Sequence, residues 1–330
     1  MDFGVIFEGT VFALFADQAL ILALAAVGLN VHFGYTGLLN FGQVGFAAMG
    51  AYGIASGVTY LGLSFGVSIA LGIALAVLLA LALGIPTLRL RADYLAIVTI
   101  ASSEVIRLTA RSAVFREQTG GSSGLGGFSA GFYGLNPFPP GSYGIGPATY
   151  DSDRFFLLCV GWTLVALCSL LVFMLMRSPW GRVLRGIRED EDAVRSLGKN
   201  VVGYKMQSLV LGGVFGAFSG FAFALANSSV QPDNYGTQFT FLAFTAMILG
   251  GAGRVLGPVI GAILFQTLLV FIDLVLREAK GAGFIPDAIL SPTDIGTVRF
   301  VLVGVFLMLL MIFRPQGLFG DKKELALDAR

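Results

Sequence analysis

Residues 65–88 read FGVSIALGIALAVLLALALGIPTL and contain no charged side chain. A helix needs about 20 mostly apolar residues to cross a bilayer, so this run predicts a membrane-spanning helix. The rest of the chain has the same character. Of 330 residues, 56% are hydrophobic and 12% are charged, whereas a soluble domain carries about 25% charged residues. The sequence therefore predicts an integral membrane protein that is surrounded by membrane lipid.

Other long apolar segments lie on both sides of this run. We predict an all-α polytopic membrane protein with about nine spans, and the pattern also fits eight or ten. Besides 65–88, the predicted spans are Val11–Leu29, Asn40–Tyr60, Asp93–Ser112, Phe155–Met176, Ser208–Ala226, Phe239–Leu249, Val255–Leu276 and Val298–Phe313. In this interpretation residues 1–320 form one transmembrane domain, with 113–153 as an outer loop, 177–207 as a cytoplasmic loop and 321–330 as a cytoplasmic tail.

Basic residues indicate the orientation, because lysine and arginine gather in short cytoplasmic loops. The first basic residue of the chain is Arg89, so the N-terminus lacks the basic region of a secretory signal and is expected to begin a retained span. The basic residues of the loop 177–207 are Arg177, Arg182, Arg185, Arg188, Arg195, Lys199 and Lys205. Two further basic regions are the link with Arg89 and Arg91 and the tail with Arg314, Lys322, Lys323 and Arg330. If all three regions are cytoplasmic, the number of spans is odd, the N-terminus lies outside and the C-terminus lies in the cytoplasm. A smaller basic group argues against this orientation, because it lies at the predicted outer end of the fourth span; it consists of Arg107, Arg111 and Arg116.

Glycine interrupts the apolar pattern in both halves of the chain. The uncharged stretch 34–43 reads GYTGLLNFGQ, and residues 250–253 read GGAG shortly before Gly257 and Pro258. A broken helix exposes backbone groups, which a membrane tolerates only inside protein or beside a wet path. A pair of breaks indicates a substrate path built on inverted repeats. The candidate path residues at the breaks are Gly34, Tyr35, Gly37, Asn40, Gln43, Gly250 and Gly251.

Two series of glycines repeat at every fourth residue within predicted spans. They are Gly212, Gly216 and Gly220, and Gly253, Gly257 and Gly261. Small residues at this spacing give a helix a flat face on which another backbone can pack closely. Tight packing within the chain and a subunit interface both explain the pattern.

Polar chemistry inside the spans is sparse. Glu104 lies near the middle of the fourth predicted span, and Arg107 follows one turn later, where the two side chains can pair. Such a group is either functional or a self-neutralising ion pair, and both interpretations stay open. Glu104 and Thr99 complete the candidate path. No catalytic motif or metal-ligand spacing is present, His32 stands apart from other ligands, and a net charge of +1 gives no nucleic-acid surface.

The most informative stretch is the cytoplasmic segment 178–200, SPWGRVLRGIREDEDAVRSLGKN. It predicts an amphipathic helix, a turn and a second short helix that ends near Gly198. The pattern of Arg182, Arg185 through Glu191, Ala193, Leu197, Gly198 and Asn200 resembles the coupling loop of ABC importer permeases. More narrowly, it resembles the longer of the two membrane subunits of branched-chain amino-acid importers. Supporting stretches are Gly34–Asn40 with Gly42, Leu88–Thr99, Thr119–Leu125, Ile248–Gly251 with Gly257 and Pro258, and Phe313–Phe319.

The resemblance implies a function and a set of partners. The chain is expected to be a permease subunit in the bacterial cytoplasmic (inner) membrane, with a homologous second permease, two cytoplasmic ATP-binding subunits and an extracytoplasmic substrate-binding protein. ATP and Mg²⁺ would be bound by the partners, and this chain would bind no cofactor and hydrolyse nothing. The residues expected to couple to the ATPase are Gly181, Arg182, Arg185, Arg188, Glu189, Asp190, Glu191, Ala193, Leu197 and Gly198.

Three other functions stay open at this point. Urea and short-amide importers have closely similar permeases, and Ala101-Ser102-Ser103 stands before Glu104 where the family often has a Gly-aromatic-Gly run. An ion-coupled secondary transporter could use Glu104 as its ion site. A membrane enzyme or scaffold is the third alternative, and the lack of polar residues clustered at one interface argues against the enzyme.

Overall fold

The computed structural model describes residues 2–89, 92–145, 148–283, 294–314 and 316–320. Within them the chain is almost entirely helical, and its two small sheets pair β1 (Leu125–Gly126) with β4 (Ser229–Val230) and β2 (Ser142–Ile145) with β3 (Ala148–Asp151). The all-α polytopic fold predicted from the sequence is confirmed.

Every segment that the sequence predicts as a span is helical over most of its length. The first is longer than predicted, because α1 (Phe3–Leu14), α2 (Asp17–Leu29) and the π-helix η1 (Asn30–Tyr35) follow one another almost without interruption. The remaining helices of this group are α3 (Gln43–Thr59), α4 (Phe65–Thr87), α5 (Ala92–Arg111), α8 (Ser152–Arg177), α11 (Val201–Asn227), α12 (Thr237–Gly250), α13 (Gly257–Gly281) and α14 (Ile295–Phe313).

In the described part of the chain, six helical stretches are long and apolar enough to cross a membrane. They are 3–35, α4, α8, α11, α13 and α14. The other three are α3, with 17 residues, α12, with 14, and α5, which carries four charged side chains along its length. A count of nine crossings therefore stays a prediction, as does the inverted repeat.

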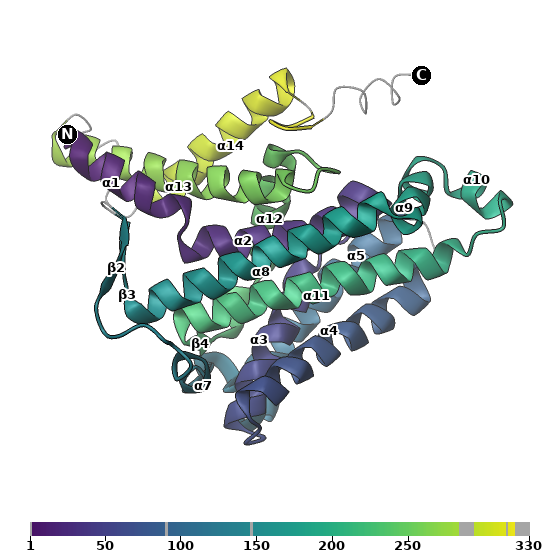
Figure 1. The fold of residues 1–330 in the computed structure, drawn as a ribbon, viewed down its shortest axis with the longest axis horizontal. Helices are drawn as coiled ribbons and strands as arrows, with labels where there is room; N and C mark the ends of the chain where they lie inside the picture. Colours follow the sequence, from purple (N-terminus) through teal and green to yellow (C-terminus); the bar gives the residue numbers. More distant parts are fainter. Residues whose placement is uncertain (1, 90–91, 146–147, 284–293, 315, 321–330) are drawn as a thin grey trace.

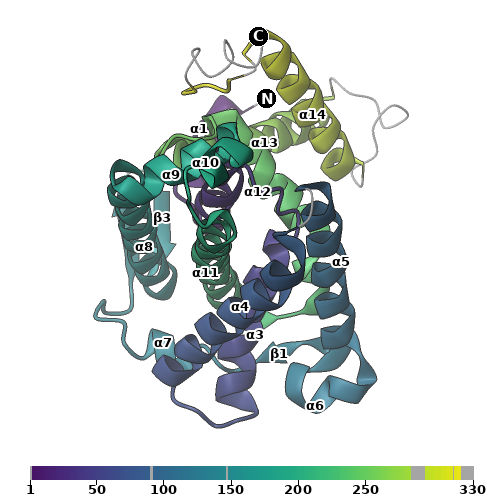
Figure 2. The ribbon, with the colours of Figure 1, turned by 90° about the vertical axis from the view of Figure 1, so that its right-hand side faces the viewer.

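Helix α11 lies at the centre of the packing, against α2, α3 and α4. In Figure 1 α8, α11 and α4 run roughly side by side along the length of the molecule, and Figure 2 shows α11 end-on between α8 and α3. The glycines explain how closely these helices pack. A Cβ on Gly220 would overlap the carbonyl oxygen of Ala47, and one on Gly212 would overlap His32. Gly212 and Gly220 therefore allow helices of this chain to pack closely, which is one of the two interpretations of this glycine series.

The outer segment predicted at 113–153 is built from short elements. Among the described residues it contains η2 (Ala113–Phe115), α6 (Arg116–Thr119), η3 (Gly121–Ser123), β1, α7 (Ala130–Tyr133), β2 and β3. Three of its aromatic residues, Phe128, Phe132 and Tyr150, are buried, whereas Phe115 is exposed. Tyr133 donates its hydroxyl to the carbonyl of Leu225 at 2.9 Å, and burial raises the pKa of that phenol.

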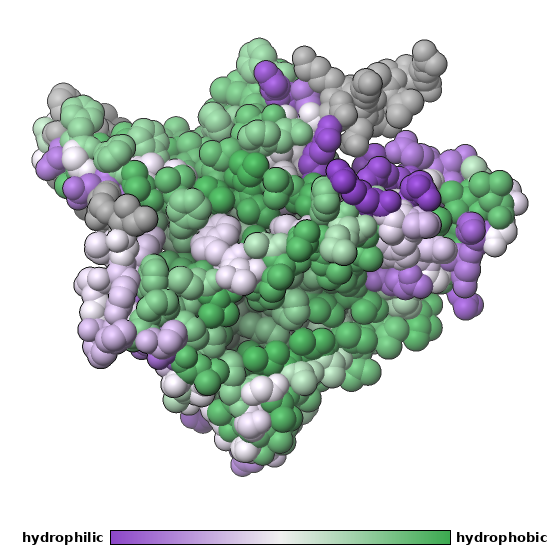
Figure 3. All heavy atoms as spheres, viewed as in Figure 1, coloured by the Kyte–Doolittle hydropathy of each residue, from purple (hydrophilic) through white to green (hydrophobic). Residues whose placement is uncertain are grey.

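The segment predicted as a cytoplasmic loop at 177–207 overlaps a long helix at each end. Arg177 is the last residue of α8, and α11 already begins at Val201. Between them lie α9 (Pro179–Glu189) and α10 (Glu191–Ser196). Figure 1 places α9 and α10 at the opposite end of the molecule from the N-terminus and from β2 and β3. Figure 3 shows hydrophilic atoms gathered over this end, beside a face that is mostly hydrophobic.

The residues that follow α14 return to the end of α12. The backbone N–H of Leu318 donates to the carbonyl of Leu249 at 2.9 Å, and that of Phe319 donates to Gly250 at 3.2 Å. Gly251 has φ +108° and Gly317 has φ +78°, and the two glycines pack directly against each other. These bonds satisfy the last carbonyls of α12, which have no partner within the helix. The tail predicted at 321–330 lies outside the described residues.

Candidate functional site

The first predicted break begins as a π-helix and continues as an irregular segment from 37 to 42. The hydroxyls of Thr36 and of Ser208 of α11 lie 2.7 Å apart and share a hydrogen bond. Both also lie within hydrogen-bond distance of the carbonyl of Val31, at 2.9 and 3.1 Å. Thr99 of α5 holds the other side of the break, because its hydroxyl accepts the backbone N–H of Phe41 at 3.1 Å. Helix interruptions need such partners, since unpaired backbone groups are costly inside a membrane.

A buried polar network lies behind this break, and its centre is His32. The Nδ2 of Asn40 donates to His32 Nδ1 and to Gln43 Oε1, both at 3.0 Å. His32 Nε2 lies 3.1 Å from the carbonyl of Leu209, and Gln43 Nε2 donates to Gly212 at 3.0 Å. Because Nδ1 accepts, Nε2 carries the proton and the imidazole is neutral. The side chains of His32, Asn40 and Gln43 are wholly buried, so in this structure Asn40 and Gln43 connect neighbouring segments by hydrogen bonds inside the protein.

The two predicted breaks meet each other through Asn30. Its Nδ2 donates to the carbonyl of Arg254, and its Oδ1 accepts the N–H of Gly253, both at 2.8 Å. A Cβ on Gly34 would lie 2.6 Å from the nitrogen of Gly253, so only glycine allows this approach. Residues that are more than 200 positions apart in the sequence are therefore joined side chain to backbone at one place.

Helix α9 is anchored to this junction. Ser178 caps its N-terminus by accepting the N–H of Trp180, and Gly181 has no room for a Cβ, which would lie 2.5 Å from Met176 Cα. Leu184 and Ile187 are buried beneath the helix. Beyond them, Arg188 Nη1 donates to the carbonyl of Gly34 at 2.5 Å. The predicted coupling segment therefore contacts the first break directly.

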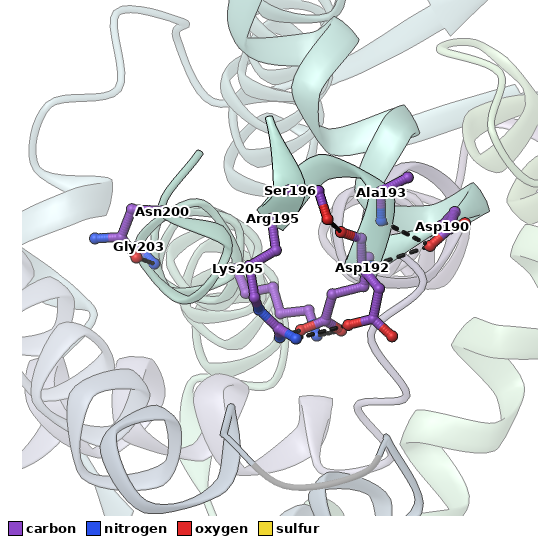
Figure 4. A network of polar contacts seen from close by, with 9 residues as sticks. Asp190, Asp192, Ala193, Arg195, Ser196, Asn200, Gly203 and Lys205 are labelled. Carbon is purple, nitrogen blue, oxygen red and sulfur yellow. Dashed lines mark hydrogen bonds and ion pairs between the residues drawn. The ribbon is translucent and has the colours of Figure 1, made fainter. Parts of the chain in front are cut away.

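Helix α10 carries the charged end of the segment, shown in Figure 4. Asp190 caps it by accepting the N–H groups of Asp192 and Ala193 at 3.0 Å. Glu191 forms ion pairs with Arg195, at 2.8 Å, and with Lys205 of α11. The second pair connects α10 to a long helix; α9 and α10 together are called the knob below. Gly198 follows the helix with φ +76°, in agreement with the predicted C-cap.

The outward face of the segment is open. Arg182, Glu189 and Ala193 are exposed, and Leu197 is 79% exposed. Arg185 is exposed as well, but its guanidinium faces the ring of Tyr35 at 5.9 Å and donates to the carbonyl of Met176 at 3.4 Å. The predicted coupling residues thus form two groups. Gly181, Arg185 and Arg188 contact the rest of the protein, whereas Arg182, Glu189, Ala193 and Leu197 face outward.

Glu104 lies apart from the two breaks. Its two carboxylate oxygens share the Nε–H of Arg107, at 3.0 and 3.1 Å, and Arg107 Nη2 donates to Oε1 at 2.5 Å. Arg107 and Arg111 also bind Asp233 of η4 (Pro232–Tyr235) at 3.0 and 3.1 Å, next to the outer sheet. Glu104 therefore belongs to an ionic cluster on the side of the outer segment, and the structure does not bring it together with Asn40, Gln43 or Gly250.

Two residues of this site, His32 and Asn30, were not predicted from the sequence. His32 stands apart from other metal ligands in the sequence, and no motif marks Asn30. Their partners at 209 and 253–254 are long-range, so no local pattern points to them. Only the unusual presence of polar side chains in a segment with few charges was a usable signal. Among the residues that the structure describes, no three His, Cys, Asp or Glu side chains come together as a metal site.

Comparison with known proteins gives a consistent result over the whole chain. The model of the family described as branched-chain amino acid transport system / permease component matches residues 11–314. The chain is 32% identical to the high-affinity branched-chain amino acid transport system permease protein LivM of Salmonella typhimurium over 313 residues, which cover 92% of this chain and 68% of that protein. It is 27% identical to the probable LivM of Methanocaldococcus jannaschii, over 91% of this chain and 90% of that protein.

A shorter likeness reaches a different transport system. The autoinducer 2 import system permease protein LsrC of Escherichia coli O9:H4 is 28% identical over 119 residues, or 36% of this chain and 34% of that protein. The long matches decide the family and the resemblance seen in the sequence. With a multi-pass helical structure and a family match from residue 11 to residue 314, the chain belongs to the branched-chain amino acid transport system permease family.

Proposed function

We propose that this chain is the membrane-spanning permease subunit of an ABC importer for leucine, isoleucine and valine. In this proposal a homologous permease, two cytoplasmic ATP-binding subunits and an extracytoplasmic binding protein complete the importer in the bacterial inner membrane. The N-terminus lies outside and the C-terminus inside. The names of the long relatives support the substrate class, and the family supports the role in transport. ATP and Mg²⁺ are bound by the partners.

One continuous set of contacts carries the proposal. Arg188 of α9 holds the carbonyl of Gly34, and Asn30, one helical turn earlier, holds Gly253 and Arg254. A displacement of α9 therefore pulls on both breaks at once. Broken helices are the segments that can change shape without disturbing a regular hydrogen-bond ladder. We infer that an ATP-driven movement of the knob shifts both breaks and opens the path alternately to either side.

The exposed face of α9 and α10 is the proposed contact with the ATPase. Leu197 is 79% exposed, and Arg182, Glu189 and Ala193 lie exposed on the same segment. An exposed leucine among charges is typical of a small docking surface with an apolar centre and a polar rim. The caps at Ser178 and Asp190 and the bridge from Glu191 to Lys205 keep this surface rigid.

Two arginines on one helix allow docking and transmission to be tested separately. We would reconstitute the full importer in proteoliposomes and measure leucine uptake and ATP hydrolysis for Arg182→Gln and Arg188→Gln, with the exposed Arg116→Gln as the matched control. Arg188→Gln is expected to retain the ATPase and to hydrolyse ATP with little uptake, because its bond to Gly34 is lost. Arg182→Gln is expected to weaken ATPase association. Equal uptake per ATP in all three variants would refute the proposed transmission.

The alternatives make different predictions in the same vesicles. Ion-coupled transport through Glu104 requires uptake to fail when the ion gradient is collapsed while ATP is present, and a coupled cation would have to compete with Arg107 for the carboxylate. An importer for urea or short amides would accumulate those solutes and leave leucine outside. ATP-dependent leucine uptake without a gradient excludes both.

A further inference from the structure

A cavity of 840 Å³ opens between α8 and the start of α13, beside Tyr35 and the second break. One face of α8 forms its wall, at positions spaced three and four apart, with Trp162, Val165, Ser169, Phe173 and Arg177 among them. From Trp162 to Arg177 this wall is about 22 Å long, since a helix rises about 1.5 Å per residue. One leaflet of hydrocarbon is about 15 Å thick, so the wall is long enough for a fatty acyl chain.

The opposite wall of the cavity is also apolar. Val255, Leu256, Val259 and Ile260 contribute side chains from the second break and the first turn of α13, and Phe319 adds a ring. Leu170 is 53% exposed and Phe173 is 39% exposed, so the cavity opens sideways onto the hydrophobic face of α8. Figure 3 shows that this side of the molecule is predominantly hydrophobic, up to the hydrophilic end over α9 and α10. A molecule that enters here comes from the bilayer.

The end of the cavity next to α9 is cationic. The guanidinium of Arg177 lies 4.1 Å from the centre of the Phe173 ring, and that of Arg185 faces Tyr35, which also lines the cavity. Neither arginine has a carboxylate partner among the described residues. Two cations held against aromatic rings at the end of an apolar groove match a phosphate head group joined to acyl chains.

A third observation lies between these two ends. Ser169 lines the cavity and is buried, and its hydroxyl has no hydrogen-bond partner among the described residues. A buried hydroxyl without a partner is unfavourable, so it points to a missing acceptor. Ser169 lies about 12 Å along α8 from Arg177, further into the apolar part. The ester carbonyl of a glycerolipid would supply that acceptor.

We propose that this cavity binds one anionic phospholipid, with its phosphate between Arg177 and Arg185 and an acyl chain along α8 toward Trp162. The charge at one end and the apolar walls favour a lipid over a free anion or an amino acid. The site does not depend on the transport mechanism. It does place a lipid beside Tyr35 and the second break.

The test uses the full-length protein purified in detergent and native mass spectrometry of bound lipid. Phosphatidylglycerol and phosphatidylcholine with identical acyl chains are compared for the wild type, Arg177→Gln, Ala166→Trp and the control Arg116→Gln. Ala166 is an exposed residue of the cavity wall, so tryptophan there fills the groove and leaves both arginines in place. Wild type and control are expected to retain phosphatidylglycerol selectively. Arg177→Gln should weaken it about fivefold, and Ala166→Trp should abolish it.

Further outcomes would overturn the proposal. Equal retention of both lipids by the wild type would remove the role of the arginines. Unchanged binding in Ala166→Trp would place the lipid elsewhere. Displacement of the lipid by leucine would assign the cavity to substrate, and displacement by inorganic phosphate alone would assign it to a free anion. Loss of the lipid on assembly with the second permease would assign the groove to that partner.

Discussion

Replacing Asn30 by alanine removes a side chain that joins the two breaks. Two hydrogen bonds are lost, to Arg254 and from Gly253, each 2.8 Å long. A hydrogen bond contributes about 0.5–1.5 kcal/mol net, so the variant should lose about 1–3 kcal/mol of stability. Asn30 is 1% exposed, and water cannot easily replace these bonds.

Asn30→Asp separates the effect of the bonds from that of side-chain volume. It keeps the acceptor for Gly253 but turns a carboxyl oxygen toward the carbonyl of Arg254, so it should be at least as damaging as alanine. Asn227→Ala is the matched control, because Asn227 is exposed and bonds only to Phe223 in its own helix at 2.9 Å.

Thermal unfolding in detergent and leucine uptake by the reconstituted importer check this prediction. We expect Asn30→Ala and Asn30→Asp to unfold at lower temperature and to reduce uptake at least about fivefold, the factor that corresponds to 1 kcal/mol. Asn227→Ala should match the wild type. If both Asn30 variants transport and unfold like that control, the breaks do not depend on this junction and the proposed transmission is wrong.

Other substitutions test the packing and the two polar groups. Gly220→Ala should lower the unfolding midpoint by an amount equivalent to about 1–3 kcal/mol, because its Cβ overlaps the Ala47 carbonyl, whereas Gly66→Ala in open space should be neutral or slightly stabilising. Asn40→Ala should cost about 1–3 kcal/mol in the same unfolding assay, because its partners are left buried and unpaired; a wild-type midpoint would disprove the network. Asp233→Asn should change stability by less than about 1 kcal/mol, since its ion pairs are partly exposed, and a larger loss would show a deeper role for that cluster.

The helices were predictable because each depends on a local pattern. An uncharged run such as 65–88 has one stable form in lipid, and the end of α10 at Gly198 follows from glycine's freedom at positive φ. The position of the breaks was also predictable, except that 30–35 is a π-helix and the irregular part begins at residue 37. Local chemistry was enough for these features.

The arrangement of the candidate site was not predictable in the same way. Asn40 and Gln43 were expected beside a path. In the structure both side chains are wholly buried and hydrogen-bonded, Asn40 to His32 of η1 and Gln43 to Gly212 of α11. Glu104 was expected near the path as well, but Arg107 and Asp233 hold it on the side of the outer segment. Such contacts join segments that are distant in the sequence, and hydrophobic periodicity carries no information about them.

The return of residues 318 and 319 to the end of α12 bears on how the protein is made. Synthesis proceeds from the N-terminus, and the last carbonyls of α12 receive their partners only about seventy residues later, after α13 and α14 have emerged from the ribosome. Until then the carbonyls of Leu249 and Gly250, next to the second break, lack these two hydrogen-bond donors. The bonds from Leu318 and Phe319 are thus a closing step of assembly, and a chain that stops at residue 314 would contain every helix that the structure describes and still lack these two bonds.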